Sequence, residues 1–396
     1  MIGAEDLGNR VEENPLSIRT SASESCISTT HNSAQQRVGI AEICTRDITG
    51  TDTINFKGER SQPLTKSAAA SGLCDQTPSG TGLFNRFGLC VKERLLQYVV
   101  KDNNGKQVGD SKYAVTTDMS LNATSLTWSE DVTVTVKSVT GIVSALNVAF
   151  EASCASPCSM SKASPWTGTK TLGLGQSASG TVTYKETLAS NTRHTFTPQY
   201  QTHITHAGVI PVDPTSSWAS PSTIRCDSEV GSNPGCVFPD YRANLELPIS
   251  QYGAAAITYL WAQLNLPDGW GDATPLRRLG STTTAEANRR ATCEDGTFSP
   301  LPSDIVADDS CDEYPFAGTY EGGTAGGLCA DIAPILENGQ WEVYQANPNK
   351  PVTLNEPCVR GHVPSGENKA AGGKLGSFVQ TDRVLETEKF NVVITA

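Results

Sequence analysis

Long apolar runs are missing from this chain of 396 residues. No stretch of about 18 consecutive apolar residues occurs, which excludes a membrane-spanning helix. The first residues, Met1 to Asp6, have neither the basic nor the apolar region of a signal peptide. Charged residues are also scarce, at 18%, whereas Gly, Ser, Thr and Ala are abundant. This composition favours an exported β-rich protein with more than one domain over a cytosolic helical one.

Positive charge is in short supply as well. The chain holds 30 Lys and Arg against 42 Asp and Glu, a net charge of −12 at pH 7, and residues 241–396 hold 11 against 20. A generic basic face for nucleic acid is therefore not expected. Local concentration of positive charge does occur, because four arginines lie within fourteen residues: Arg277, Arg278, Arg289 and Arg290.

Several catalytic motifs are absent too. There is no Walker loop, GxGxxG or GxSxG pattern, so the usual signals of nucleotide binding and of α/β-hydrolase chemistry are missing. His362 is the only histidine beyond residue 240, which leaves little material there for a Ser/His/Asp or Cys/His catalytic set. No CxxC pair and no Cys/His set with zinc-finger spacing occurs, which disfavours structural zinc.

Cysteine, by contrast, is plentiful. The twelve cysteines are even in number, and three pairs lie close in sequence: Cys154/Cys158, Cys226/Cys236 and Cys293/Cys311. Six disulfides formed in an oxidising compartment explain this pattern better than metal binding does. We therefore expect a secreted, extracellular protein whose signal peptide is absent from the numbered chain. We predict disulfides Cys226–Cys236 and Cys293–Cys311; the second closes a loop of about 18 residues and contributes on the order of 3 kcal/mol.

Residues 1–80 are rich in Ser, Thr, Gly, Asn and Gln and show little sustained apolar periodicity. Such a segment buries too little apolar surface to define a core of its own. Its cysteines Cys26, Cys44 and Cys74 indicate that it is tethered to another part of the chain. We predict a weakly structured extension here.

Residues 81–240 carry the signals of strands. The run from Leu95 to Val100 leads into Asn104-Gly105, a strong two-residue hairpin turn. From Val132 to Val136, apolar residues alternate with polar ones, which gives a strand one buried and one wet face. Three further segments have strand character: Ile142 to Phe150, Gly180 to Tyr184 and His194 to Ile204. Short strands at this spacing predict an all-β, sandwich-like domain.

The pattern changes near residue 240. Apolar residues from Ile257 to Leu264 recur at helical spacing, and Pro267-Asp268-Gly269 ends the helix. Thr283 to Glu286 form a capping-box pattern that opens a second helix. Two strands and a Gly-containing helix complete the region: Trp341 to Tyr344, Phe390 to Ile394, and Glu367 to Phe378. We therefore predict a multidomain chain in which residues 241–396 form a small α+β domain.

Two adjacent carboxylates, Asp312 and Glu313, precede an aromatic-Pro-aromatic turn in this region. Hydrolysis of a phosphodiester needs an activated water and stabilisation of developing charge, which carboxylates and a divalent cation can supply. Neighbours on a strand face opposite ways, so a turn at Pro315 would be needed to bring both to one site. The plain alternative is an exposed acidic loop, since Asp308 and Asp309 lie just upstream.

The pair Glu367-Asn368 opens the Gly-containing helix and is the natural partner of these carboxylates. Carboxylate and amide oxygens are the ligands that hard divalent cations prefer. The alternative is simple charge complementarity at a helix N-terminus, worth about 0.3–1 kcal/mol. The residue types alone leave both interpretations open.

Taken in order, the blocks of this region resemble the NucA/NucB deoxyribonucleases, secreted metal-dependent endonucleases of Gram-positive bacteria. The resemblance covers about residues 245–396. It rests on these segments: Asp312-Glu313-Tyr314-Pro315, Glu321-Gly322-Gly323, Glu367-Asn368 with Gly372, the strand from Phe390 to Ile394, and the arginine-bearing stretches Arg277-Arg278-Leu279 and Ala287-Asn288-Arg289-Arg290-Ala291. Any one block is a weak signal, but the ordered set is fairly specific.

The resemblance implies a nuclease domain that hydrolyses DNA with Mg²⁺ or Mn²⁺. It implies three groups of site residues: Asp312, Glu313 and Glu367 for catalysis; Glu313, Glu367 and Asn368 for the metal; and Arg278, Arg289 and Arg290 for phosphate. Glu321 and His362 are further candidates. An immunity or inhibitor protein is a conceivable partner, whose identity the sequence does not give.

The chain also departs from the family pattern. Smaller members carry a histidine in the first helix, where this chain has Ala256, and residues 329–364 resemble an insertion that affects substrate access. These departures, with the acidic balance, keep a second function open: a disulfide-rich extracellular binding protein with a degenerate nuclease-like domain. The complete carboxylate blocks favour the nuclease.

Overall fold

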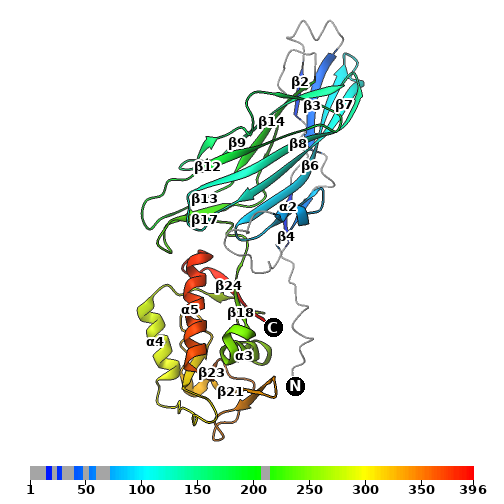
Figure 1. The fold of residues 1–396 in the computed structure, drawn as a ribbon. Helices are drawn as coiled ribbons and strands as arrows, with labels where there is room; N and C mark the ends of the chain where they lie inside the picture. Colours follow the sequence, from blue (N-terminus) through cyan, green and yellow to red (C-terminus); the bar gives the residue numbers. More distant parts are fainter. Residues whose placement is uncertain (1–14, 20–24, 29–39, 48–52, 59–71, 207–214) are drawn as a thin grey trace. The chain divides into compact units, whose positions relative to one another are not determined.

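The computed structural model describes residues 15–19, 25–28, 40–47, 53–58, 72–206 and 215–396. These residues form two compact units, and the boundary between the units lies between Tyr241 and Arg242. Strands dominate the first unit, whereas the second combines helices and strands (Figure 1). No helix within the described ranges is long and apolar enough to span a membrane.

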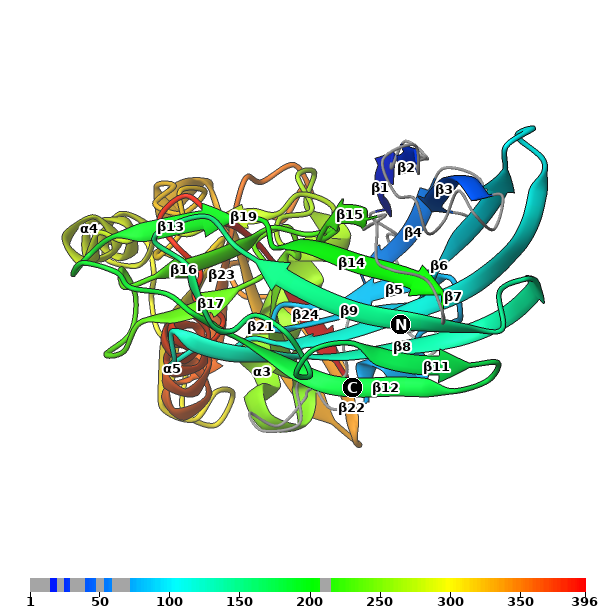
Figure 2. The same cartoon turned by 90° about the horizontal axis from the view of Figure 1, so that it is seen from above.

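The first unit contains a large, mostly antiparallel sheet, ten-stranded in the described residues. Its order is β1-β4-β5-β6-β7-β8-β12-β10, with β3 also paired to β6 and β2 to β3. The long strands β7, β8 and β12 lie side by side in Figure 2. The bounds are β1 Pro15–Arg19, β2 Ser25–Ser28, β3 Ile40–Asp47, β4 Thr53–Gly58, β5 Thr81–Phe84, β6 Gly88–Asp102, β7 Gln107–Ser120, β8 Thr127–Gly141, β10 Ser159–Lys162 and β12 Ser177–Lys185; the short helix α2 is Leu73–Gln76.

Two smaller sheets complete the first unit. One has the order β11-β9-β14-β15 and the other β13-β16-β17. The predicted strand from His194 to Ile204 is divided between β13 and β14, because Thr197 and Pro198 interrupt it. The bounds are β9 Ala145–Ser153, β11 Lys170–Gly173, β13 Arg193–Phe196, β14 Gln199–His206, β15 Thr215–Ala219, β16 Ile224–Asp227 and β17 Gly235–Val237.

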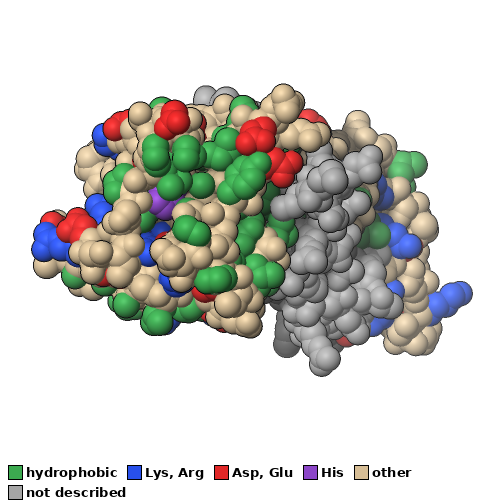
Figure 3. All heavy atoms as spheres, turned by 90° about the horizontal axis from the view of Figure 1, so that it is seen from below, with side chains coloured by type: hydrophobic (Ala, Val, Ile, Leu, Met, Phe, Trp, Pro, Cys, Tyr) green, Lys and Arg blue, Asp and Glu red, His purple; other side chains and the backbone are tan. Residues whose placement is uncertain are grey.

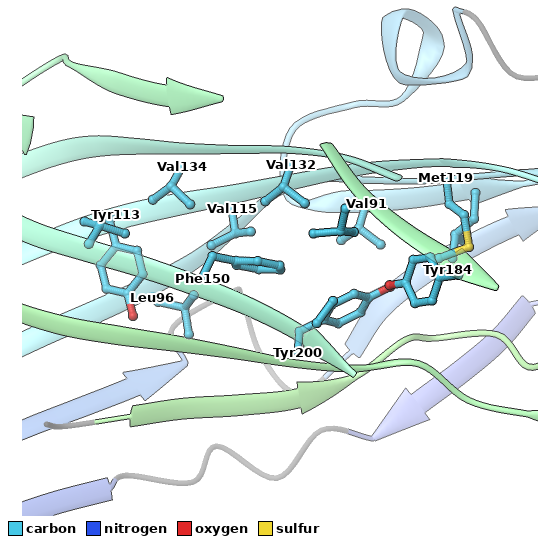
Figure 4. Packing of buried hydrophobic residues seen from close by; sticks show 14 of the residues in the cluster. Val91, Leu96, Tyr113, Val115, Met119, Val132, Val134, Phe150, Tyr184 and Tyr200 are labelled. Carbon is cyan, nitrogen blue, oxygen red and sulfur yellow. The ribbon is translucent and has the colours of Figure 1, made fainter. Parts of the chain in front are cut away.

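The large sheet and the sheet of β9 and β14 enclose one apolar core (Figure 4). Val132 and Val134 of β8 are fully buried, as their alternation with polar residues predicts. Phe150 of β9 and Tyr200 of β14 fill the same core from the other sheet. The tips of Tyr184 and Tyr200 point toward each other in Figure 4. The first unit is therefore rich in strands, as the strand pattern of the sequence indicates.

The described part of residues 1–80 is more regular than the composition suggests. Strands β1 to β4 belong to the large sheet, and β3 pairs along β6. Two disulfides hold this region, Cys26–Cys44 between β2 and β3 and Cys74–Cys90 between α2 and β6. These strands are ordered because β3 pairs with β6, a strand far along the chain. A short window of sequence cannot reveal such a distant partner. The rest of the predicted extension lies outside the described residues.

The second unit contains three helices and two sheets in its described residues (Figure 1). The sheets have the orders β18-β24-β19 and β20-β23-β21-β22. Helices α3 and α5 both pack on β20 and β23. The bounds are β18 Ala243–Pro248, α3 Ile249–Asn265, β19 Leu276–Arg277, α4 Thr282–Cys293, β20 Asp309–Tyr314, the 3₁₀ turn η2 Gly326–Leu328, β21 Ala330–Glu337, β22 Gln340–Gln345, β23 Val359–Pro364, α5 Ser365–Thr381 and β24 Lys389–Thr395.

The helix boundaries follow local chemistry. α3 ends at Asn265, directly before Leu266-Pro267, because proline disfavours helical backbone in the residue before it. α4 begins after Ser281, whose side chain accepts a hydrogen bond from the Thr284 backbone N–H. The N-cap is thus Ser281, two residues before the Thr283 of the predicted capping box.

Six disulfides are formed among the described residues. Both predicted bonds, Cys226–Cys236 and Cys293–Cys311, are present. The second joins the last residue of α4 to the strand that carries Asp312 and Glu313. The two remaining bonds are Cys154–Cys158 and Cys329–Cys358.

Candidate active site

The side chains of Asp312 and Glu313 project from opposite faces of β20. Side chains alternate along a strand, so Cys311 and Glu313 share one face while Asp312 faces the other. Contacts agree with this alternation: Asp312 bonds to Tyr259 of α3, whereas Glu313 lies beside Arg289 of α4. The turn at Pro315 therefore does not bring the two side chains onto one face.

Asp312 is held on the α3 side of the sheet with only 4% of its surface exposed. The Tyr259 hydroxyl donates a hydrogen bond of 2.8 Å to its Oδ2 atom. Burial raises the pKa of Asp312 well above its usual value, and the nearby charge of Glu313 raises it further. The Tyr259 hydrogen bond and the charge of Arg289 act in the opposite direction. Among the described residues, none hydrogen-bonds to Oδ1.

Glu313 lies at the α4 side of β20 and is 9% exposed. Its Oε1 atom is 3.7 Å from Arg289 Nε, and its Oε2 atom is 3.5 Å from Cys293 Sγ. Burial raises the pKa of Glu313, while Arg289 and the backbone N–H groups of Glu313 and Ala317 lower it. The Cys293–Cys311 bond joins the end of α4, the helix that carries Arg289, to this face of β20.

Glu367 lies in the first turn of α5 and contacts the start of α3. Its Oε2 atom accepts a hydrogen bond from the Ala254 backbone N–H. The chain turns sharply there, because Gly253 has φ 45 and ψ −124 inside α3. A Cβ atom at residue 253 would collide with the Glu367 carboxylate, so the position requires glycine. No hydrogen bond or ion pair between described residues joins Glu367 to Asp312 or Glu313.

Asn368 links the same end of α5 to β20. Its Nδ2 atom donates to Ser310 Oγ at 3.1 Å and to the Cys311 carbonyl at 2.8 Å. Ser310 is on the same strand face as Asp312, since the two residues are two positions apart. Asp312 and Asn368 are thus brought to the side of β20 that α3 and α5 cover. No described residue donates a hydrogen bond to Asn368 Oδ1.

The donor set suits a hard divalent cation in its chemistry. Carboxylate oxygens of Asp312 and Glu367 and the amide oxygen of Asn368 are ligands that Mg²⁺ and Mn²⁺ accept. However, the carboxylate oxygens of Asp312, Glu313 and Glu367 do not all lie within 4.8 Å of one another. In the described residues that criterion is met by Cys26, Glu42 and Cys44, but these two cysteines form a disulfide.

The arginines predicted to bind phosphate differ in their surroundings. Arg289 and Arg290 of α4 are exposed, with side chains 61% and 60% accessible, and Arg290 pairs with Glu286 one turn away. Arg278 donates from Nη1 to the Val384 carbonyl at 2.7 Å. On the face in Figure 3, basic side chains are scattered among acidic, hydrophobic and uncharged ones. Arg289 is therefore the arginine that combines exposure with proximity to a candidate carboxylate.

The two further candidates make structural contacts. Glu321 accepts hydrogen bonds from the Arg277 backbone N–H and from Arg277 Nε. His362 Nδ1 lies 2.7 Å from Asp309 Oδ2, and its ring stacks on Phe298 with centroids 4.4 Å apart. These contacts fix the turn after β20 and the loop before it.

Sequence reasoning missed Tyr259, the direct partner of Asp312. The two residues are 53 positions apart, and a tyrosine at helical spacing among apolar residues is indistinguishable from a core residue. Ala256, at the position compared with the family histidine, is fully buried in the core of this unit. The helix therefore contributes Tyr259 to the neighbourhood of Asp312.

Comparison with known proteins supports the resemblance. Residues 270–341 match the family Deoxyribonuclease NucA/NucB, and this range holds β19, α4, β20, β21 and the start of β22. The C-terminal unit thus contains a NucA/NucB deoxyribonuclease region, which indicates a nuclease and a hydrolase. Asp312, Glu313 and the arginines lie inside the matched range, whereas Glu367, Asn368 and α3 lie outside it. No match to a curated protein was found for the chain.

Proposed function

We propose that this protein is a secreted, metal-dependent, non-specific endodeoxyribonuclease that hydrolyses phosphodiester bonds in DNA. The observation that carries the proposal is the family match at residues 270–341, which contains the adjacent carboxylates Asp312 and Glu313 on β20. Local geometry supports it, because hydrogen bonds from Asn368 bring the start of α5 against the same strand.

In this proposal Asp312 is the group that orients and deprotonates the attacking water. A buried carboxylate whose pKa is raised is a stronger base than an ordinary surface carboxylate. Its Oδ2 atom is occupied by the Tyr259 hydroxyl, so Oδ1 is the oxygen assigned to the water. Asn368 is anchored through its Nδ2 atom, which directs its amide oxygen away from β20.

A divalent cation would be held by Glu367 and Asn368 on the face of β20 that carries Asp312, and would stabilise the charge that develops on the phosphate oxygens. Glu367 can keep its bond to the Ala254 N–H through Oε2 while Oε1 remains for the cation. Glu313, which the resemblance also gives as a metal ligand, faces the other side of β20 and is not assigned to this cation. Its position beside Arg289 suits a role in placing that guanidinium.

Arg289 would contact the phosphate backbone of DNA, aided by Arg290 and Arg278. Phosphate contacts position a nucleic acid without reading its sequence, which accords with non-specific cleavage. The unit has few basic residues, so binding relies on a small number of such contacts and on the cation.

An extracellular location agrees with six disulfides, since such bonds persist in oxidising compartments. Residues 81–240 would form a separate β-rich domain that contributes no residue to the carboxylate site. Residues 1–80 would extend it, and residues 241–396 would form the nuclease domain.

The competing function is that of an extracellular binding protein with an inactive nuclease-like domain. One observation favours it: the three carboxylates do not form a compact ligand group. A plasmid-nicking assay with Mg²⁺ or Mn²⁺, with and without chelator, separates the two. Nicking that requires the cation supports the nuclease, and its absence from folded protein moves the binding function ahead.

A further inference from the structure

Helix α3 delivers the hydroxyl of Tyr259 to Asp312. The hydroxyl donates to Asp312 Oδ2 at 2.8 Å, and both side chains are buried. A hydrogen bond to a carboxylate in such surroundings is stronger than one in water. The Tyr259 hydrogen bond therefore makes the two Asp312 oxygens different: Oδ2 accepts it and Oδ1 does not.

The ring of Tyr259 cannot move without disturbing an aromatic cluster. It stacks on Tyr314 with centroids 5.2 Å apart and meets Phe316 edge-on at 4.9 Å. Tyr314 and Phe316 contact each other edge-on at 5.0 Å. Tyr314 is two residues after Asp312 on β20, so its stacking on Tyr259 holds the Tyr259 ring against the strand that carries Asp312. Such aromatic pairs contribute specific geometry in addition to apolar burial.

The helix itself is fixed on both sides of Tyr259. Thr258 packs against Gly361 of β23, where a Cβ atom would collide with the threonine side chain. At the start of the helical turns, the Ala254 N–H bonds to Glu367 of α5. The Tyr259 hydroxyl is therefore placed by contacts of its helix to β23, the strand paired with β20, and to α5, which carries Glu367.

We propose that Tyr259 is a positioning residue for catalysis: it fixes Asp312 Oδ2 so that Oδ1 faces the attacking water. This inference rests on the proposed function. Without the hydroxyl, no hydrogen bond from a described side chain holds the Asp312 carboxylate about χ2. A displacement of about 1 Å at a reacting group costs on the order of 100-fold in rate.

The test compares Tyr259→Phe with Tyr314→Phe in the full chain. Both changes keep a ring and remove one buried hydroxyl from the same cluster, but the Tyr314 hydroxyl donates to the Trp270 carbonyl instead of Asp312. We measure kcat and KM for cleavage of double-stranded DNA at saturating Mn²⁺, and thermal unfolding in chelator. Tyr259→Phe should lower kcat by about 10- to 100-fold with KM within about twofold. Tyr314→Phe should lower the unfolding temperature comparably, with at least about tenfold less effect on kcat.

A double-mutant cycle with Asp312→Asn supplies the second readout. If Tyr259 acts through Asp312, adding Tyr259→Phe to Asp312→Asn causes no further loss of kcat. Additive losses, or equal kcat losses in the two single tyrosine variants, would overturn the positioning role. Wild-type cleavage with an unchanged kcat in Tyr259→Phe removes this inference alone. A folded wild-type protein that does not cleave DNA removes the proposed function and this inference with it.

Discussion

Arg360 binds Asp331 through two parallel hydrogen bonds, Nε to Oδ1 at 2.7 Å and Nη2 to Oδ2 at 2.9 Å. Arg360 is 1% exposed and joins β23 to β21, the strand paired with it on the side away from β20. Its Nη1 atom also donates to Thr297 Oγ1, so the pair ties the loop after α4 to the sheet. A buried, bidentate ion pair of this kind is costly to break on one side only.

We predict that Arg360→Met destabilises the C-terminal unit by about 3–5 kcal/mol, because Asp331 is left buried without its partner. Urea unfolding of the full chain measures the change. Arg290→Met is the matched control: it breaks the exposed pair with Glu286 and should cost no more than about 0.5 kcal/mol. Similar losses in both variants would show that the buried pair has no special role.

The Glu130 carboxylate gives the β-rich unit a predicted pH dependence. It is fully buried and accepts hydrogen bonds from Tyr184 and Tyr200 at 2.7 and 2.9 Å. Burial raises the pKa of Glu130 from 4.5 to about 7, against the opposing effect of these hydrogen bonds. Between these values the folded protein holds a proton that the unfolded chain releases. Stability from this group is therefore complete below about pH 4.5 and is lost as the pH rises to about 7.

We expect the loss over this window to be on the order of 3 kcal/mol at most. Denaturant unfolding at several pH values, in the wild type and in Glu130→Gln, measures it. Glutamine keeps an acceptor but does not titrate, so the variant should lack this part of the slope. Asp118, whose pKa burial raises to about 6, contributes a slope of the same sign, and Asp118→Asn separates the two. If the difference in unfolding free energy between wild type and Glu130→Gln did not change with pH, Glu130 would not be the source of this pH dependence.

The strand pattern of the chain was predictable because it is local. Asn104-Gly105 lies in the turn between β6 and β7, with Gly105 at φ 74; this turn spans residues 103–106 and is longer than the predicted two-residue turn. Val132 and Val134 are buried by the same alternation that predicts β8. The partners of β3 could not be predicted, since backbone pairing with β6 joins residues that are 49 to 62 positions apart, from Asp47↔Leu96 to Ile40↔Asp102.

The site shows the same division between local and distant signals. The block at Asp312-Glu313 and the segment at Glu367-Asn368 could be recognised as sequence motifs. Strand alternation also predicts that Asp312 and Glu313 face opposite ways. The contacts of Asp312 with Tyr259 and of Glu367 with Ala254 could not be inferred, because each joins elements whose packing no local spacing encodes.

We predict that Glu367→Gln lowers cation-dependent DNA cleavage by at least about 100-fold with the fold intact. Glutamine can still accept the Ala254 N–H bond, so the loss would reflect the missing charge. Glu313→Gln should also lose activity, because a neutral side chain attracts the Arg289 guanidinium less strongly. Glu342→Gln on β22 is the control and should cleave normally. Plasmid nicking and circular dichroism check both parts, and full activity in Glu367→Gln would exclude it from the site.

Arg289→Ala should weaken DNA binding and reduce its salt dependence. Loss of one phosphate contact lowers the slope of log K against log salt by about 1. Fluorescence anisotropy in the Glu367→Gln background measures binding without cleavage. Arg193 of the β-rich unit, also exposed and paired with Glu229, supplies the control Arg193→Ala, for which no change is expected. An unaltered salt slope in Arg289→Ala would move the DNA contact elsewhere.

A fragment of residues 241–396 should retain nicking activity. The division between Tyr241 and Arg242 is the basis, because the carboxylates, α3, α5 and two disulfides all lie on one side of it. The fragment has its own core, which includes Tyr259, Phe378 and Phe390. Its fold is checked by cooperative thermal unfolding under non-reducing conditions, and its activity by cation-dependent nicking relative to the full chain. A fragment that unfolds cooperatively but does not nick DNA would show that residues before 241 complete the site, and that the β-rich unit takes part in catalysis or in substrate binding.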